Sequence, residues 1–361
     1  MEQDKISVII PVHNGAKYIR KTAKGILDQD YRNIELILVE NFSKDNSLEL
    51  CNQIAKLDDR VKVFQSFEKG TNLARKKGIE AATGKYILFS DVDDSYINNS
   101  SIREMYNAII EDGTQICQFG YYKKSQIGLK RKVSAVNTVT FLSRAEIFEY
   151  QIKGVCSSTL TDISVQVWNK IYETQLLKTV IKNMTYSLFY SEDMYINILS
   201  FCNSIIQKVS VRPESYYIYR TGIGISSSSG FGFNLLKEYN YVKGDAVKLL
   251  KKNEADDSVL YAVYIEVLYL YLLIIKEMIE NRQIMNDILE KITEIEDFQI
   301  VKEAKAYFNG LDKEKLYDEL SFMSSDYTPE EYYNFVFNKV NSQSFKVKIN
   351  NKIKKVIKKI I

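Results

Sequence analysis

The chain has 361 residues, of which 45% are hydrophobic and 26% are charged. These proportions are typical of a soluble folded protein, so they exclude intrinsic disorder, collagen-like repeats and a protein with many membrane spans. The four cysteines show no Cys-x-x-Cys spacing and the chain has one histidine. This argues against a disulfide framework and a structural zinc site, and indicates a reducing compartment.

The net charge of +3 is unevenly distributed along the chain. The last 17 residues, 345–361, contain seven lysines and no acidic residue, which leaves the rest of the chain at −4. A mildly acidic body argues against nucleic-acid binding, because that function needs a basic face that replaces phosphate counterions. The N-terminus lacks the basic segment and apolar core of a signal peptide, so we expect a cytoplasmic protein.

The first third of the chain alternates between apolar runs and segments of helical periodicity. Strands are predicted at 6–11, 34–39, 61–65 and 86–90, and helices at 16–29, 47–55 and 72–81. This alternation favours a parallel sheet with helices on both faces, which binds ligands at the carboxyl ends of its strands. The polar residues that follow three of these strands are therefore expected in one crevice. They are His13 and Asn14, Glu40 and Asn41, and Asp91 to Asp94.

Beyond residue 100 the alternation weakens. Helices are predicted at 101–111, 144–151 and 170–178, with mixed strands to about residue 139. This region is interpreted as an extension of the sheet that carries substrate loops. A Gly/Ser-rich stretch, 222–232, separates it from a long helical region at 233–341. The most apolar part of that region, 259–275, is interrupted by Glu266 and is shorter than the roughly 20 residues that span a bilayer, which predicts a buried helix.

Two groups of acids could carry chemistry. Asp91-Val92-Asp93-Asp94 follows a predicted strand, and two carboxylates one residue apart can bind one Mg²⁺ or Mn²⁺ and leave coordination positions for a diphosphate. An Asp-rich turn before the next helix explains the same residues. Glu192-Asp193 lies between aromatic and apolar residues, where burial would raise the pKa of a carboxylate and suit it to act as a general base. Acids in the first turn of a helix over 193–201 are the alternative.

Seven short motifs stand at intervals along the chain. They are Pro11-Val12-His13-Asn14, Glu40-Asn41-Phe42-Ser43-Lys44-Asp45, Ala74-Arg75 with Gly78, Ala82-Thr83-Gly84-Lys85-Tyr86-Ile87, Asp91-Val92-Asp93-Asp94, Val167-Trp168-Asn169-Lys170 and Glu192-Asp193. Over about residues 5–226 their order and spacing resemble those of family 2 glycosyltransferases with the GT-A fold. The resemblance implies a Rossmann-like, mostly parallel mixed sheet flanked by helices. It also implies an inverting transfer of a sugar from a nucleotide-sugar, usually a UDP-sugar, to an acceptor hydroxyl in cell-surface polysaccharide synthesis.

The resemblance further implies roles for individual residues. Residues that would bind the donor are Pro11, His13, Asn14, Glu40, Asn41, Arg75, Asp91, Arg220 and Ser226, with Arg75 near the phosphates, Asp91 near the ribose, and Arg220 and Ser226 in a mobile segment over the diphosphate. Asp93 would hold Mn²⁺ or Mg²⁺, and Asp193 would be the general base. On the acceptor side, beside Glu192, Trp168 would be either a platform for a sugar ring or a core residue.

Two motifs depart from the family pattern. Glu40-Asn41-Phe42-Ser43 stands where the family commonly has Asp-Asp-Gly-Ser, and the second Asp usually pairs with the uracil imide. Asn41 can accept through its carbonyl and can also donate, so the base preference is open. His13 replaces the usual Tyr of the first motif, and it either contacts the base or lies exposed in a loop.

The resemblance and the composition together predict three domains. A glycosyltransferase domain at 1–226 has a nucleotide-binding half at 1–99 and an acceptor half at 100–226, followed by a helical region at 227–341 and a tail at 342–361. The apolar residues of the tail follow helical spacing with lysines between them, which indicates a basic amphipathic helix. Such a helix would lie on an anionic membrane, at the inner face of the cell membrane where a glycan or lipid-linked acceptor is presented. The alternative is a helix docked on the protein itself or in a homo-oligomer.

Two other functions are compatible with parts of the sequence. A sugar nucleotidyltransferase has a similar fold, but its Gly-rich phosphate loop with basic residues is missing from 9–15. A non-catalytic protein that binds nucleotide-sugars would explain the change at Glu40-Asn41. The presence of Asp93 and Asp193 argues against loss of catalysis.

Overall fold

The computed structural model describes residues 4–144 except 126, 127 and 129, together with 146–147, 164–221, 231–254, 257–311 and 318–341. Ser226, the tail at 342–361 and most of the helix expected at 144–151 lie outside the described residues. The described residues divide into two compact units, of which the first contains those up to 221 and the second those from 231.

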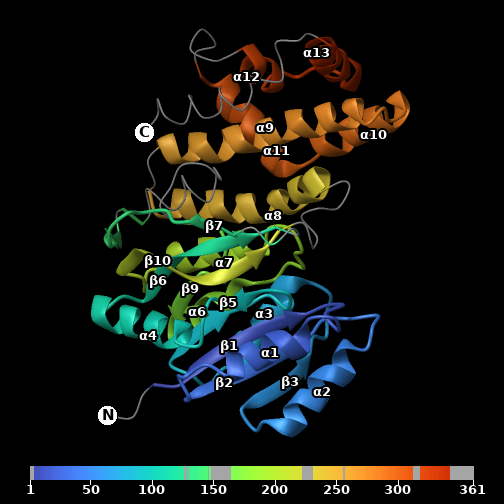
Figure 1. Ribbon diagram of the computed structural model, residues 1–361. Helices are drawn as coiled ribbons and strands as arrows, with labels where there is room; N and C mark the ends of the chain where they lie inside the picture. The colour runs from blue at the N-terminus through green and yellow to red at the C-terminus, as the bar shows by residue number, and fades with distance from the viewer. Residues whose placement is uncertain are drawn as a thin grey trace. The chain divides into compact units, whose positions relative to one another are not determined.

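The first unit is built on a mixed sheet (Figure 1). Its described strands are β1 (Ile6–Val12), β2 (Ile34–Glu40), β3 (Val61–Gln65), β4 (Tyr86–Phe89), β5 (Ser95–Tyr96), β6 (Ile116–Lys124), β7 (Lys130–Val133), β8 (Thr140–Ser143), β9 (Lys170–Glu173) and β10 (Lys208–Arg220). The spatial order is β3-β2-β1-β4-β9-β6-β10-β5, with β7 on β6 and β8 on β10. β3, β2, β1 and β4 are mutually parallel, and β6 is parallel to β10. β9 runs antiparallel between β4 and β6.

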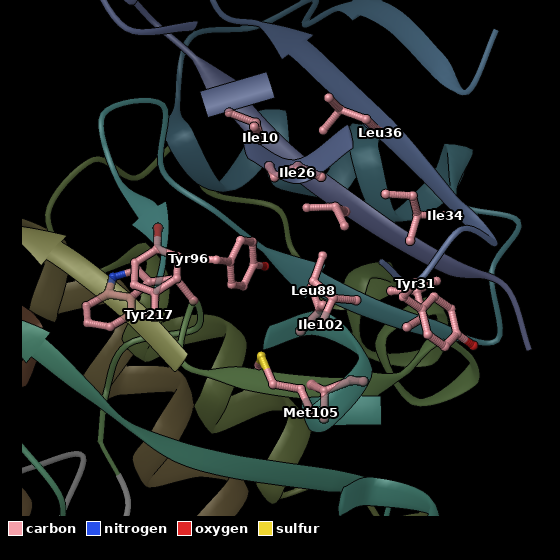
Figure 2. Packing of buried hydrophobic residues seen from close by; sticks show 14 of the residues in the cluster. Ile10, Ile26, Tyr31, Ile34, Leu36, Leu88, Tyr96, Ile102, Met105 and Tyr217 are labelled. Carbon is pink, nitrogen blue, oxygen red and sulfur yellow. The ribbon is translucent and has the colours of Figure 1, made fainter. Parts of the chain in front are cut away.

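Helices cover both faces of this sheet. α1 (Ile19–Leu27), α2 (Ser47–Leu57) and α4 (Ser101–Asp112) pack on one face, and α3 (Thr71–Ala81) packs on β1 and β2 from the other, beside α6 (Thr174–Val180) and α7 (Glu192–Phe201). The first face is a continuous apolar core, because alternate residues of each strand point to it. Figure 2 shows part of this core, where Ile10 and Leu36 of the sheet lie near Ile26 of α1.

Most of the predicted elements are confirmed, with ends that differ by one to three residues. The helix expected at 170–178 is wrong in its first turn. Residues Lys170–Glu173 form β9, which pairs with β4 and β6, and the helix begins only at Thr174. Long-range strand pairing on both sides overrides the local periodicity here, as it often does for short apolar segments.

The second unit is helical. It contains α8 (Phe231–Lys252), α9 (Asp257–Glu280), α10 (Met285–Glu296), α11 (Gln299–Asn309), α12 (Asp318–Met323) and α13 (Pro329–Asn341). α9 is central, because α8, α11 and α13 all pack on it. α9 is long and apolar enough to cross a membrane, but 61% of its most apolar stretch is buried within the structure. Glu266 of α9 accepts hydrogen bonds from the buried Lys243 (2.8 Å) and from Tyr239 (3.0 Å), which confirms the expected buried helix.

Gly78 permits the close packing of α3 on the sheet. It is buried in the middle of the helix, and a Cβ atom at this position would overlap Cγ2 of Ile9 on β1. Gly25, in α1, provides a contrast because a Cβ there would meet no atom within 4 Å. The identity of residue 78 therefore fixes the distance between α3 and β1, and with it the position of every side chain that α3 carries.

Gly78→Ala is expected to destabilise the protein by about 1–3 kcal/mol, because overpacking forces the helix away from the strand. Gly25→Ala is the matched control, for which we expect a gain of about 0.5–1 kcal/mol from the better helix propensity of alanine. Urea unfolding followed by circular dichroism measures both. Equal stability of the two variants would contradict the packing argument.

Candidate active site

The ends of β1 and β2 are joined by hydrogen bonds. The backbone N–H of Asn41 donates to the carbonyl of Val12 (2.8 Å), and Nδ1 of His13 donates to the carbonyl of Asn41 (2.7 Å). Asn14 donates its backbone N–H to Oγ of Ser43 (3.0 Å). The structure therefore brings two of the three predicted strand ends together. His13 and Asn14 are exposed, whereas the side chain of Asn41 is buried.

Two of the residues predicted to bind the nucleotide-sugar have buried side chains at the ends of β1 and β2. Pro11 is buried in β1, where it pairs in register with Val39. The carboxylate of Glu40 is also buried, and it accepts the backbone N–H of Ser43. Both side chains thus shape the turns that carry His13 and Asn41, instead of facing solvent.

Arg75 occupies the centre of the site. Only 2% of this side chain is exposed, and its guanidinium pairs with Asp91 (3.0 Å), Glu192 (3.2 Å) and Asp193 (2.7 Å). Asp91 follows β4, and the other two acids form the first turn of α7. One buried cation therefore joins the third strand end to a helix about 100 residues further along. Arg75 was expected beside a phosphate. Its guanidinium is instead buried and contacts the three carboxylates.

Three carboxylates share one guanidinium in this cluster. Burial, and then the charge of Asp193, raises the pKa of Glu192 above its usual range. Burial also raises the pKa of Asp91, although the charge of Arg75 opposes this effect. Burial disfavours the charged form of Arg75, but the surrounding carboxylates raise its pKa, so the guanidinium keeps its charge. Glu192 is the group in this cluster that is best placed to hold a proton near neutral pH.

Asp193 is held by a second contact. Its Oδ2 accepts the backbone N–H of Val167 (3.3 Å), and Asn197 donates to the neighbouring carbonyl of Val165 (2.6 Å). Lys170 fixes the same segment, because its fully buried ammonium donates to the carbonyls of Ser164 (2.7 Å) and Gln166. Lys170 was not among the expected site residues. The available signal was its place at the end of the motif Val167-Trp168-Asn169-Lys170.

Asp93 and Asp94 have different surroundings. Asp94 is buried, and its Oδ1 accepts the backbone N–H of Arg220 (2.7 Å). Asp93 is partly exposed and forms no ion pair with any residue that the structure describes. Burial raises the pKa of Asp93, and the nearby charge of Arg220 lowers it. A small cavity of about 40 Å³ lies here, lined by both acids together with Tyr18, Lys124 and Arg220.

A divalent metal at Asp93 would require further oxygen ligands around it. Within the described ranges, no group of three or more His, Cys, Asp or Glu side chains is placed to hold a metal ion. A single carboxylate nevertheless suits Mg²⁺ or Mn²⁺ when a substrate diphosphate and water supply the other ligands. The available donor set therefore fits a metal that arrives with the nucleotide and does not fit a resident metal.

Trp168 is a core residue, which corrects the expectation of an acceptor platform. Its side chain is 3% exposed. The indole stacks on the rings of Tyr217 (4.7 Å between centroids) and Tyr219 (5.2 Å), and it meets Tyr121 edge to face. The hydroxyl of Tyr217 accepts the backbone N–H of Asp91 (2.9 Å). The aromatic stack thus supports the acidic turn from behind and leaves no ring face for a sugar.

Part of the chain resembles a known protein family. Residues 7–167 match the model of the family described as glycosyl transferase family 2. This part of the chain is similar to glycosyltransferase family 2. The match runs from β1 through β8 and ends at Val167, before β9, so the carboxylates of α7 lie beyond it.

Curated relatives are named as glycosyltransferases. The chain is 28% identical over 232 residues to glycosyltransferase GlyA of Streptococcus pneumoniae, a match that covers 60% of this chain and 30% of GlyA. It is 30% identical over 129 residues to the putative teichuronic acid biosynthesis glycosyltransferase TuaG of Bacillus subtilis, covering 32% of this chain and 51% of TuaG. The matches thus span about a third and about half of these glycosyltransferases.

The solved structures establish the fold. The crystal structure of S. aureus TarS 1–349 in complex with UDP-GlcNAc has a TM-score of 0.55 to this chain, with 19% identity. The match covers 93% of this chain and 90% of that one, so it includes both the sheet and the helical region. This confirms the predicted GT-A fold with a helical C-terminal region.

Glu192→Gln is expected to change how stability depends on pH. A carboxyl with a raised folded-state pKa stabilises the fold fully below its unfolded pKa, and this stabilisation is lost as pH rises through the folded pKa. Glutamine imitates the protonated form at all pH values. The melting temperature of the wild type should therefore fall below that of Glu192→Gln between about pH 4.5 and pH 8. A difference that does not change over this interval would contradict the raised pKa of Glu192.

Proposed function

We propose that this protein is an inverting glycosyltransferase that moves a sugar from a nucleotide-sugar, with UDP as the nucleotide, to an acceptor hydroxyl in cell-surface polysaccharide synthesis. The family match and the names of the relatives support a transferase and a polysaccharide pathway. The UDP-GlcNAc complex of TarS supports a UDP-sugar donor. A soluble enzyme that acts at the inner face of the cell membrane, with the tail at 342–361 on anionic lipid, is part of the same proposal.

The ion pairs of Arg75 are the observation that carries the proposal. They hold Asp193 of α7 beside Asp91 at the end of β4, although the two acids are about 100 residues apart in the sequence. An acid at this strand end and an acid on the facing helix are what a single displacement needs, since the donor leaves on one side and the acceptor attacks from the other. With 20% of its side chain exposed, Asp193 can still be reached by an acceptor hydroxyl.

In this mechanism each residue of the site has a separate role. Asp193 takes the proton of the attacking hydroxyl as the general base. Arg75 and the N–H of Val167 fix the position of that carboxylate from two sides. Asp93 would hold Mn²⁺ or Mg²⁺, which when bound neutralises charge on the departing diphosphate. Arg220, beside Asp93, adds positive charge at the same end of the site.

Asp193→Asn should reduce turnover by about 10² or more, since general bases contribute about 10² to 10⁴, and should leave UDP affinity unchanged. UDP release from a panel of UDP-sugars with Mn²⁺ measures turnover, and calorimetry measures affinity. Asp112→Asn is the matched control, because Asp112 is also a buried helical acid that accepts from an arginine, Nε of Arg212 (2.9 Å). This control should lose stability and keep its turnover. Near-normal turnover of Asp193→Asn would place the base elsewhere, with Glu192 as the first candidate.

Asp93→Ala should remove the gain in UDP affinity that Mn²⁺ provides. The described residues contain no group of three or more His, Cys, Asp or Glu side chains that could hold the ion without Asp93. Calorimetry of UDP binding with Mn²⁺ and with EDTA compares the two conditions. A variant whose UDP affinity still rises with Mn²⁺ as in the wild type would refute the metal assignment.

A further inference from the structure

Phe42 adopts a backbone conformation that its side chain disfavours. Its φ angle is +55°, in the left-handed region that glycine enters freely and that is strained for a bulky residue. The family pattern commonly has glycine at this position of the second motif. The chain therefore keeps a phenylalanine where local conformational energy favours glycine.

Burial does not compensate for this strain. The side chain of Phe42 is 40% exposed and is absent from the apolar core of the sheet. Its ring lies 5.9 Å from the ammonium of Lys69, a weak contact at an exposed site. Strained residues that the core does not require cluster at ligand-binding positions.

The neighbours of Phe42 are suited to a heterocyclic ligand. Asn41 precedes it, with a side chain that is 4% exposed and an Oδ1 atom that has no partner among the described residues. A buried acceptor without a partner is costly, and an N–H group of a ligand would satisfy it. The exposed ring of His13 is tied to the same residue by its hydrogen bond to the carbonyl of Asn41. The residue with the unsatisfied acceptor is thus followed in the chain by one exposed ring, Phe42, and bonded through its carbonyl to another, His13.

We infer that Phe42 is a residue that binds the nucleobase of the donor, with its ring stacked on the face of the base while Asn41 accepts an N–H group at the edge. The inference rests on the proposed function and adds a base-contacting residue to it. Aromatic stacking tolerates any base, because every base has a π face. Stacking on Phe42 therefore contributes affinity for any base, and the hydrogen bond to Asn41 determines which base is preferred.

Phe42→Gly in the full-length chain tests this role. We expect the Kd for UDP to rise by about fivefold to a hundredfold, the range that base stacking on an aromatic side chain supports. The same factor should appear with Mn²⁺ and with EDTA, since the lost contact is with the base. The melting temperature should not fall, because glycine relieves the strain at φ +55°.

Phe67→Ala is the control variant. Phe67 is 85% exposed and its ring lies 5.4 Å from the ammonium of Lys77, so it is another exposed aromatic residue beside a lysine. This variant should bind UDP as the wild type does. If the wild type binds UDP and Phe42→Gly binds it equally well, or loses affinity only with Mn²⁺, the inference is overturned. Failure of the wild type itself to bind UDP would overturn the proposed function together with the inference.

Discussion

The ion-pair cluster of Arg75 is the interaction on which the candidate site depends. A fully buried guanidinium without partners would be very costly, and so would three partly buried carboxylates without a cation. The observed arrangement satisfies both demands by bringing α3, the end of β4 and the first turn of α7 to one point. The packing of α3 on β1 through Gly78 sets the position from which Arg75 acts. Electrostatics and core packing therefore specify the same geometry.

The sequence predicted the first 99 residues of the fold well, because their elements are long, periodic and locally consistent. β1 to β4 and α1 to α3 follow from apolar runs and helical spacing that no long-range contact overrides. The same reasoning failed at Lys170–Glu173. That segment is short, and its strand state depends on β4 and β6, which are far away in the sequence.

The sequence predicted which residues lie at the candidate site, but it predicted only some of the contacts between their side chains. The strand-end residues His13, Asn41 and Asp91 were expected from the periodicity alone. That Arg75 would bind Asp91 and both acids of α7 depends on side-chain directions that a linear pattern does not contain. Trp168 illustrates the same limit, since an aromatic residue in a motif can serve a sugar or the core equally well until its neighbours are known.

Two buried cations divide the task of positioning Asp193. Arg75 makes an ion pair with Oδ1 of Asp193. Lys170 donates to the carbonyl of Ser164, in the segment whose Val167 N–H donates to Oδ2 of Asp193. Burial lowers the pKa of Lys170 to about 7, and the negative charge of Asp193 acts in the opposite direction. The direct bonds of the Lys170 ammonium are to the carbonyls of the loop, whereas Arg75 makes the ion pair with Asp193. The carboxylate of Asp193 is thus fixed from both sides, by the guanidinium of Arg75 and by the N–H of Val167, and such positioning is what the proposed general base needs.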